Sequence, residues 1–165
     1  MAPIARRSIA NQTVVRGTGL HTGAATEATF LPAPAGRGIV FRRTDLGGRP
    51  EVPARLTEVE AVERRTAIGH GEATIHTVEH LLAAVAAHQI DDLTVDLSGP
   101  EPPILDGSVL PYFEALANAG PTDVGGEAAF LSVQAPFTVT EATRRTSWRP
   151  PRRCASPSRS SGPIR

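Results

Sequence analysis

Two helical segments with a strand between them constrain the fold of this chain more than any other feature. Apolar residues recur at helical spacing from about Val78 to His88, and a second helix is predicted from about Val109 to Ala119. Between them, LTVDLS (93–98) alternates between apolar and polar residues as a strand does. The chain before the first helix is patterned as short strands, so the sequence predicts an α+β fold.

The predicted strands before the first helix are separated by glycine- and proline-rich turns such as PAPAGRG and LGGRP. Residues 65–68 and 73–76 flank GHGE, which indicates a hairpin directly before the helix. The four strand-like runs are TVVRGTGL, ATEATFLPA, GIVFRRTDL and EVPARLTEV.

Charge is unevenly distributed along the chain. All 17 acidic residues precede residue 142, whereas 7 of the 17 basic residues follow residue 143, so the first 143 residues carry a net charge of −7. An acidic body argues against a nucleic-acid-binding surface. The last 22 residues are rich in Arg, Pro and Ser, so we expect residues 144–165 to be disordered. They are interpreted either as the product of a shifted reading frame or as a basic arm for RNA or an acidic partner.

Other classes of protein are excluded by composition. No apolar run approaches the length of a transmembrane segment, and the first residues lack the apolar region of a secretory signal. The single cysteine, Cys154, excludes an internal disulfide framework and a cysteine-rich metal site. We therefore expect a cytoplasmic protein.

The stretch HTVEH contains the inverted zinc-peptidase pattern H-x-x-E-H, formed by His76, Glu79 and His80. A two-histidine site needs both histidines on consecutive turns of one helix. Thr77 is a good N-cap, and a helix that begins there leaves His76 on the preceding strand. The pattern is thus compatible with a two-histidine site, a one-histidine site, or a core helix with a polar start.

The predicted helix has two faces. Val78, Leu81, Leu82 and Val85 form the core stripe, while His80 lies with Ala83, Ala84 and Ala87 on a face of small side chains expected to pack against another element. The helix start favours a negative Glu79 and a neutral His80, the form of imidazole that binds metal. The structural alternative is that Glu79 only interacts with the helix dipole and that His80 is a hydrogen-bonded residue at the boundary of the core.

A second metal-like pattern, H-x-x-x-D, is formed by His88 and Asp92. His80 and His88 lie about 12 Å apart along a helix, so they cannot bind one zinc ion. We interpret this pattern as chance.

Three longer stretches carry a resemblance: GTGLHTG (17–23), PAPAGRGIVFRRTDL (32–46) and the segment 77–120, which holds TVEHLLAA and PPILDGS. Together they resemble the bacterial UDP-3-O-acyl-N-acetylglucosamine deacetylases of lipid A biosynthesis, over about residues 6–141. The resemblance implies a zinc amidohydrolase with two similar α+β domains. Each domain would be a two-layer sandwich of a small sheet on two helices.

The resemblance also implies roles for individual residues. His80 would be a Zn²⁺ ligand, and Glu79 the general base that activates the attacking water on a UDP-acyl-glucosamine substrate. His21 and Asp106 match polar positions that lie near or support the site, although loop and helix-cap roles would explain them as well. Arg42 and Arg43 match a family run that we assign to a solvated strand face.

The sequence departs from the family in its ligand set. The family takes further histidine and aspartate ligands from its second domain, whereas no histidine follows His88 here. A catalytic zinc site needs three protein ligands, and only His80 is identified. The sequence therefore predicts a first domain over 1–124, the beginning of a truncated second domain over 125–143 and a tail over 144–165. The alternatives are an inverted-motif zinc peptidase and an inactive half-domain that associates with another chain.

Overall fold

A computed structural model describes the chain in four stretches, and the chain divides into two compact units, Met1–Ala128 and Ala129–Arg165. The described stretches are residues 4–60, 65–129, 135–141 and 144–148.

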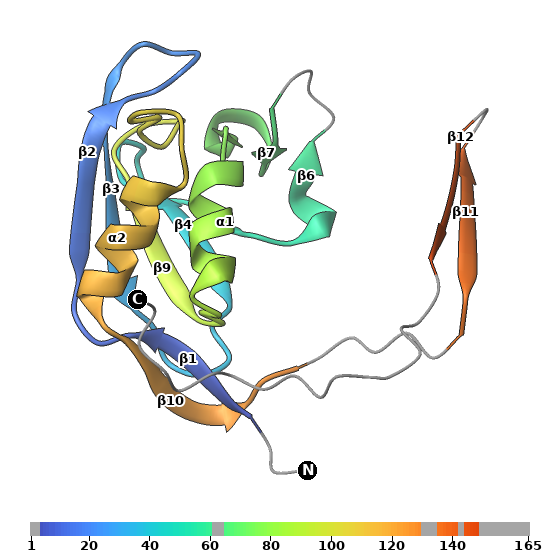
Figure 1. The fold of residues 1–165 in the computed structure, drawn as a ribbon. Helices are drawn as coiled ribbons and strands as arrows, with labels where there is room; N and C mark the ends of the chain where they lie inside the picture. Colours follow the sequence, from blue (N-terminus) through green and yellow to red (C-terminus); the bar gives the residue numbers. More distant parts are fainter. Residues whose placement is uncertain (1–3, 61–64, 130–134, 142–143, 149–165) are drawn as a thin grey trace. The chain divides into compact units, whose positions relative to one another are not determined.

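The first unit is built around a mixed five-stranded sheet of order β2-β3-β9-β4-β5 (Figure 1). Strands β4 and β9 are parallel, and the other neighbouring pairs are antiparallel. Each strand lies in one of the predicted runs, which confirms those predictions. The strands are β2 (Thr13–Thr18), β3 (Ala25–Pro32), β4 (Ile39–Arg43), β5 (Glu51–Pro53) and β9 (Leu93–Leu97).

Two helices, α1 (Glu79–Ala87) and α2 (Leu110–Ala119), cover one face of this sheet (Figure 1). The core lies between the two layers and includes Phe30 and Phe41 from the sheet with Leu81 and Leu116 from the helices, all fully buried. Burial of this apolar surface provides the main driving force for the arrangement. The predicted two-layer α+β fold is confirmed.

Two smaller sheets flank these layers. In the first, β6 (Val59–Glu60), β7 (Ala67–Ile68) and β8 (Ile75–His76) are antiparallel, and β7 and β8 form the predicted hairpin around GHGE. In the second, β1 (Ala5–Ile9) pairs with β10 (Pro121–Glu127), next to the point where α2 ends. Two short 3₁₀ helices, η1 (Leu56–Glu58) and η2 (Gly71–Ala73), complete the elements of this unit within the described residues.

The helix boundaries agree with the sequence, but the predicted N-cap of the first helix does not. The N-cap of α1 is Val78, with no side-chain cap, so the prediction that Thr77 caps this helix is wrong. The Thr77 hydroxyl donates instead to the buried carboxylate of Glu101, at 2.6 Å. The N-cap of α2 is Val109, and the Ser108 hydroxyl accepts the N–H of Leu110 at 3.2 Å. Gly120 ends α2 with a φ of 73°, a left-handed conformation that glycine adopts without strain.

The small-residue face of α1 is not one packed surface. Ala84 is fully buried in the core, whereas Ala83 and Ala87 are exposed in the first unit. Helical rotation places Ala84 beside Leu81 and Val85, on the core side of the boundary between the two faces.

The second unit contains an antiparallel hairpin, β11 (Phe137–Glu141) paired with β12 (Arg144–Trp148). The predicted end of the truncated second domain, residue 143, falls between these two strands, and a disordered tail was predicted from Arg144 onwards. Residues 144–148 are instead a strand, and the rest of the predicted tail, 149–165, lies outside the described residues.

No helix in the described ranges is long and apolar enough to cross a membrane.

Candidate active site

Both helices begin at the same end of the first unit (Figure 1). The loop between β2 and β3 (19–24) and the loop between β9 and α2 (98–109) reach the same end, where hydrogen bonds to Glu101 join them to the residues before α1. We call this the site end, and the opposite end, where α1 and α2 finish, the far end. The predicted site residues Glu79, His80, His21 and Asp106 all belong to segments at the site end.

Glu79 and His80 are the first two residues of α1, and both are half-buried. The Glu79 carboxylate accepts the backbone N–H of Thr66 through Oε2, at 3.2 Å. Among the described residues, no hydrogen bond or ion pair engages Oε1 of Glu79 or the imidazole of His80. A carboxylate held by one oxygen, such as Glu79, can accept a proton with the other. A neighbouring free imidazole, such as His80, can act as a metal ligand.

His76 is the second residue of β8, where it lies opposite Ala67, and its backbone N–H donates to Pro100 O at 2.8 Å. The helix begins three residues later, so His76 and His80 do not form a helical i,i+4 pair, and the two-histidine alternative lacks its required geometry. Burial lowers the pKa of His76, and the positive charge of Arg65 acts in the same direction. The Nδ1 atom is buried without a hydrogen-bond partner among the described residues.

Glu101 was not identified from the sequence. It is 1% exposed, and its carboxylate accepts hydrogen bonds from Thr77, His21 and Thr22. Burial alone would raise its pKa, but these donors outweigh burial and hold the pKa of Glu101 below its ordinary value. The only sequence signal was one acidic residue in the proline-rich loop GPEPPILDG, which is also typical of an exposed turn.

His21 and Asp106 lie on the two loops, and both are exposed. The backbone of His21 donates to Glu101, at 3.0 Å to Oε2, and its side chain has no hydrogen-bond partner among the described residues. Asp106 accepts the N–H and the hydroxyl of Ser108, both at 2.9 Å, and these bonds lower its pKa. Asp106 thus shapes the turn that leads into α2, as the helix-cap alternative anticipated.

The arginines of the RRTDL run do not form a solvated strand face. Arg43 is 4% exposed, pairs with Asp45 at 2.7 Å and donates to the carbonyl groups of Glu72 and Thr74. Arg42 is half-buried and makes two hydrogen bonds to Asp96, at 2.6 and 2.7 Å. The prediction is wrong because Arg43 joins β4 to the segment around η2, a long-range contact that a strand pattern does not reveal.

The two residues of the H-x-x-x-D pattern, His88 and Asp92, make structural contacts at the far end. His88 Nε2 lies 2.8 Å from Phe113 O, and the two rings stack at 4.1 Å. Asp92 is fully buried and paired with Arg6 at 2.7 Å. Both side chains have structural partners, which agrees with the interpretation of this pattern as chance.

The donor set for a metal is incomplete in the part of the chain that the structure describes. No group of three His, Cys, Asp or Glu side chains there could hold a metal ion. The free imidazole of His80 fits one position of a zinc site, and the remaining ligands would have to come from elsewhere.

Comparison with known proteins gives one consistent family. Residues 6–158 match the family described as UDP-3-O-acyl N-acetylglycosamine deacetylase, beyond the expected limit at residue 141. The bifunctional enzyme LpxC/FabZ of Chlorobaculum tepidum is 49% identical over 117 residues, 71% of this chain and 25% of that enzyme.

Two other relatives are named UDP-3-O-acyl-N-acetylglucosamine deacetylase. The protein of Geobacter sp. strain M21 is 39% identical over 149 residues, 90% of this chain and 49% of the relative. The protein of Synechocystis sp. is 47% identical over 106 residues, 64% of this chain and 38% of the relative. The chain therefore spans about half the length of its relatives, or less.

Proposed function

Since the chain belongs to the UDP-3-O-acyl-N-acetylglucosamine deacetylase family, we propose that it supplies the first-domain part of a zinc-dependent deacetylase. The enzyme would remove the N-acetyl group of a UDP-3-O-acyl-N-acetylglucosamine in lipid A biosynthesis, in the cytoplasm. The observation that carries the proposal is the pair Glu79 and His80 at the start of α1, at the end where the His21 and Asp106 loops meet.

In this proposal, each residue has one role. His80 is a zinc ligand, and bound zinc would polarise the acetamide carbonyl and favour hydroxide over water. Glu79 accepts the proton of the attacking water through Oε1, while the Thr66 N–H holds Oε2. The proton then passes to the departing amine, so the products are acetate and a free glucosamine amine.

The two loops would support this chemistry in different ways. The exposed imidazole of His21 is available to the substrate, since its loop is held through the backbone and not through the ring. Asp106 acts on the shape of the 98–109 loop through Ser108. Its contribution would be indirect.

We assign the missing zinc ligands to a second domain of the family. The length of the relatives supports this assignment, as does the lack of a three-donor group in the described residues. We propose that the second domain begins near residue 125, close to the boundary of the first unit at Ala128. The shifted-frame origin of the sequence after residue 143 stays a hypothesis that the other two reading frames of the gene would test.

A chimera tests the proposed function. Residues 1–128 are joined to the part of the Geobacter relative that corresponds to residue 129 onwards, and acetate release from UDP-3-O-acyl-N-acetylglucosamine is measured. Glu79→Gln should lower turnover about 10²–10⁴-fold and leave the zinc content near that of the parent. Arg16→Gln, on the exposed edge strand, is the control and should change neither. A folded chimera that retains zinc but releases no acetate would refute the proposed function.

A further inference from the structure

We propose that Glu101 is a positioning residue of the candidate active site, which joins the His21 loop to the start of α1 through one buried carboxylate. The inference rests on the proposed function for the roles of His21, Glu79 and His80. It is carried by five hydrogen bonds that converge on Glu101 from two separate segments.

The hydrogen bonds divide between the two oxygens of the carboxylate. Oε1 accepts the Thr77 hydroxyl at 2.6 Å and the His21 N–H at 3.2 Å. Oε2 accepts the His21 N–H at 3.0 Å, the Thr22 N–H at 3.0 Å and the Thr22 hydroxyl at 3.1 Å. In all five the carboxylate accepts, an arrangement that favours its ionised form, in which both oxygens act as acceptors only.

The backbone around Glu101 is itself fixed. Pro100 O accepts the N–H of His76, and the N–H of Ile104 donates to Thr18 O, both at 2.8 Å. Glu101 therefore lies between two backbone contacts that attach its loop to β8 and to the end of β2. A carboxylate fixed in this way can impose its position on its partners.

Thr77 transmits that position to α1. Its φ is 55°, in the left-handed region that a β-branched residue rarely adopts, and its hydroxyl is held by Glu101. Helix α1 has no side-chain N-cap, so this bond replaces the usual device that fixes where a helix starts. The start of α1 in turn sets the direction of Glu79 and His80, two and three residues further on.

Gly19 allows the His21 loop to close over the carboxylate. A Cβ at Gly19 would lie 2.5 Å from Oε2 of Glu101 and 2.3 Å from the Thr22 hydroxyl, closer than Cβ atoms come to other atoms. A side chain at this position would therefore push the loop away from Glu101. The loop backbone and the carboxylate fit together only with glycine there.

The test uses the full chain without metal or substrate. NMR spectra report the His21 and His80 imidazole signals, and hydrogen exchange reports the amides of Thr22 and of Leu82, the latter bonded to Val78 O. In Glu101→Gln, the new amide group faces the His21 or the Thr22 N–H in either orientation. Both imidazole signals should shift, and both amides should exchange roughly ten-fold faster, as expected for one lost charge-assisted hydrogen bond.

Matched variants separate positioning from stability. Thr77→Val removes only the hydroxyl, and it should shift the His80 signals and speed the exchange of the Leu82 amide. Thr77→Ser retains the hydroxyl and should leave both as in the parent. Ser8→Ala is the control: Ser8 lies on β1 at the far end, is fully buried and accepts the Ala33 N–H at 3.0 Å. It should lower the thermal unfolding temperature without moving the His21 or His80 signals.

The proposal is overturned if Glu101→Gln unfolds at a lower temperature yet leaves both imidazole signals in place. It is equally overturned if Ser8→Ala moves the same signals as Glu101→Gln, because the response would then follow global stability. Since these readouts need neither zinc nor substrate, they stand whether or not the chimera releases acetate. An inactive chimera would therefore count against the proposed function and not against the positioning role.

Discussion

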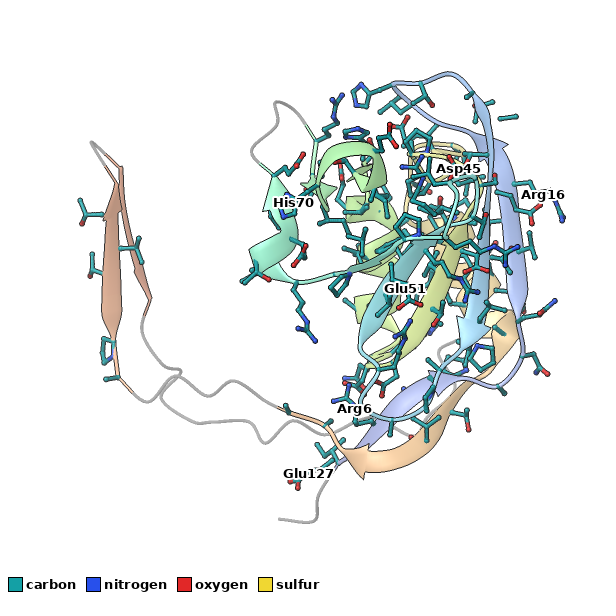
Figure 2. All side chains as sticks on the ribbon, turned by 180° about the vertical axis from the view of Figure 1, so that it is seen from behind. Arg6, Arg16, Asp45, Glu51, His70 and Glu127 are labelled. Carbon is teal, nitrogen blue, oxygen red and sulfur yellow. The ribbon has the colours of Figure 1, made fainter. Side chains whose placement is uncertain are left out.

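Among the described residues, each end of the helical layer contains one fully buried carboxylate, but the two carboxylates are satisfied in different ways. At the far end, Asp92 accepts two hydrogen bonds from the Arg6 guanidinium, at 2.7 and 2.8 Å, and one from the Gly38 N–H at 2.7 Å. At the site end, the described partners of Glu101 are hydroxyl and backbone N–H groups. Figure 2 shows the separation of the ends, with Arg6 of β1 at one end and Asp45 toward the other.

The difference indicates what each carboxylate does. Asp92 and Arg6 form a compensated ion pair that joins β1 to the turn after α1, so its role is to hold the fold together. Glu101 keeps its full negative charge next to the residues before Glu79 and His80. An ionised carboxylate near a candidate metal ligand affects the site through charge as well as geometry. We therefore expect substitutions at the far end to change stability, and substitutions at the site end to change local structure as well.

Asp92→Asn should have the largest effect on stability. Loss of one partner leaves the Arg6 guanidinium facing a neutral amide in a buried setting, which should cost about 3–5 kcal/mol of unfolding free energy. Urea unfolding measures this loss. In the exposed pair Arg16–Glu27, whose side chains are 70% and 38% exposed, Arg16→Gln should cost no more than about 1 kcal/mol. Equal losses at the two positions would contradict the structural role of Asp92.

Glu101→Gln should have a smaller effect that depends on pH. The folded-state pKa of Glu101 lies below its ordinary value of 4.5, so its contribution is present above that pH and is lost as the pH falls through the folded pKa. The variant should be less stable than the parent by about 1–3 kcal/mol at pH 7. The difference in unfolding free energy between the variant and the parent should become smaller in acid, below the ordinary pKa of glutamate. Urea unfolding at several pH values measures this difference. A difference that does not change with pH would show that the carboxylate charge does not contribute to stability.

Tyr112→Phe should have the smallest effect of the three. The Tyr112 hydroxyl donates to Pro103 O, and burial raises the pKa of this hydroxyl well above its ordinary value. Since the bond attaches the Glu101 loop to α2, its loss should cost about 1 kcal/mol. The His80 NMR signals should stay in place, because Glu101 and not Tyr112 contacts Thr77. A shift of those signals would mean that the loop as a whole, and not Glu101, positions the start of α1.

The sequence predicted most of the first unit because its elements are local patterns. Both helices, the GHGE hairpin and the strands of the main sheet follow from spacing and turn residues within short windows. The errors concern residues whose partners lie far away in the chain. Thr77 looked like a cap, but its hydroxyl bonds to Glu101, 24 residues later, and Arg43 looked solvated but reaches Glu72 and Thr74.

The candidate site was predictable only in part for the same reason. Glu79 and His80 are adjacent in sequence and carry a recognisable pattern, whereas Glu101 meets His21 across 80 residues. A contact of that kind depends on which loops the fold brings together, and no local periodicity encodes it. The placement of His76 on a strand was predicted correctly, although the cap that suggested it was wrong.

Zinc content of the chimera, measured after dialysis against a weak chelator, is the most direct test of a one-histidine zinc site at the start of α1. His80→Ala removes a proposed ligand and should empty the site, while His76→Ala should retain about as much zinc as the parent, because His76 lies on β8 and outside α1. If His76→Ala releases the metal as thoroughly as His80→Ala, or if His80→Ala retains it, the one-histidine site at the start of α1 is wrong.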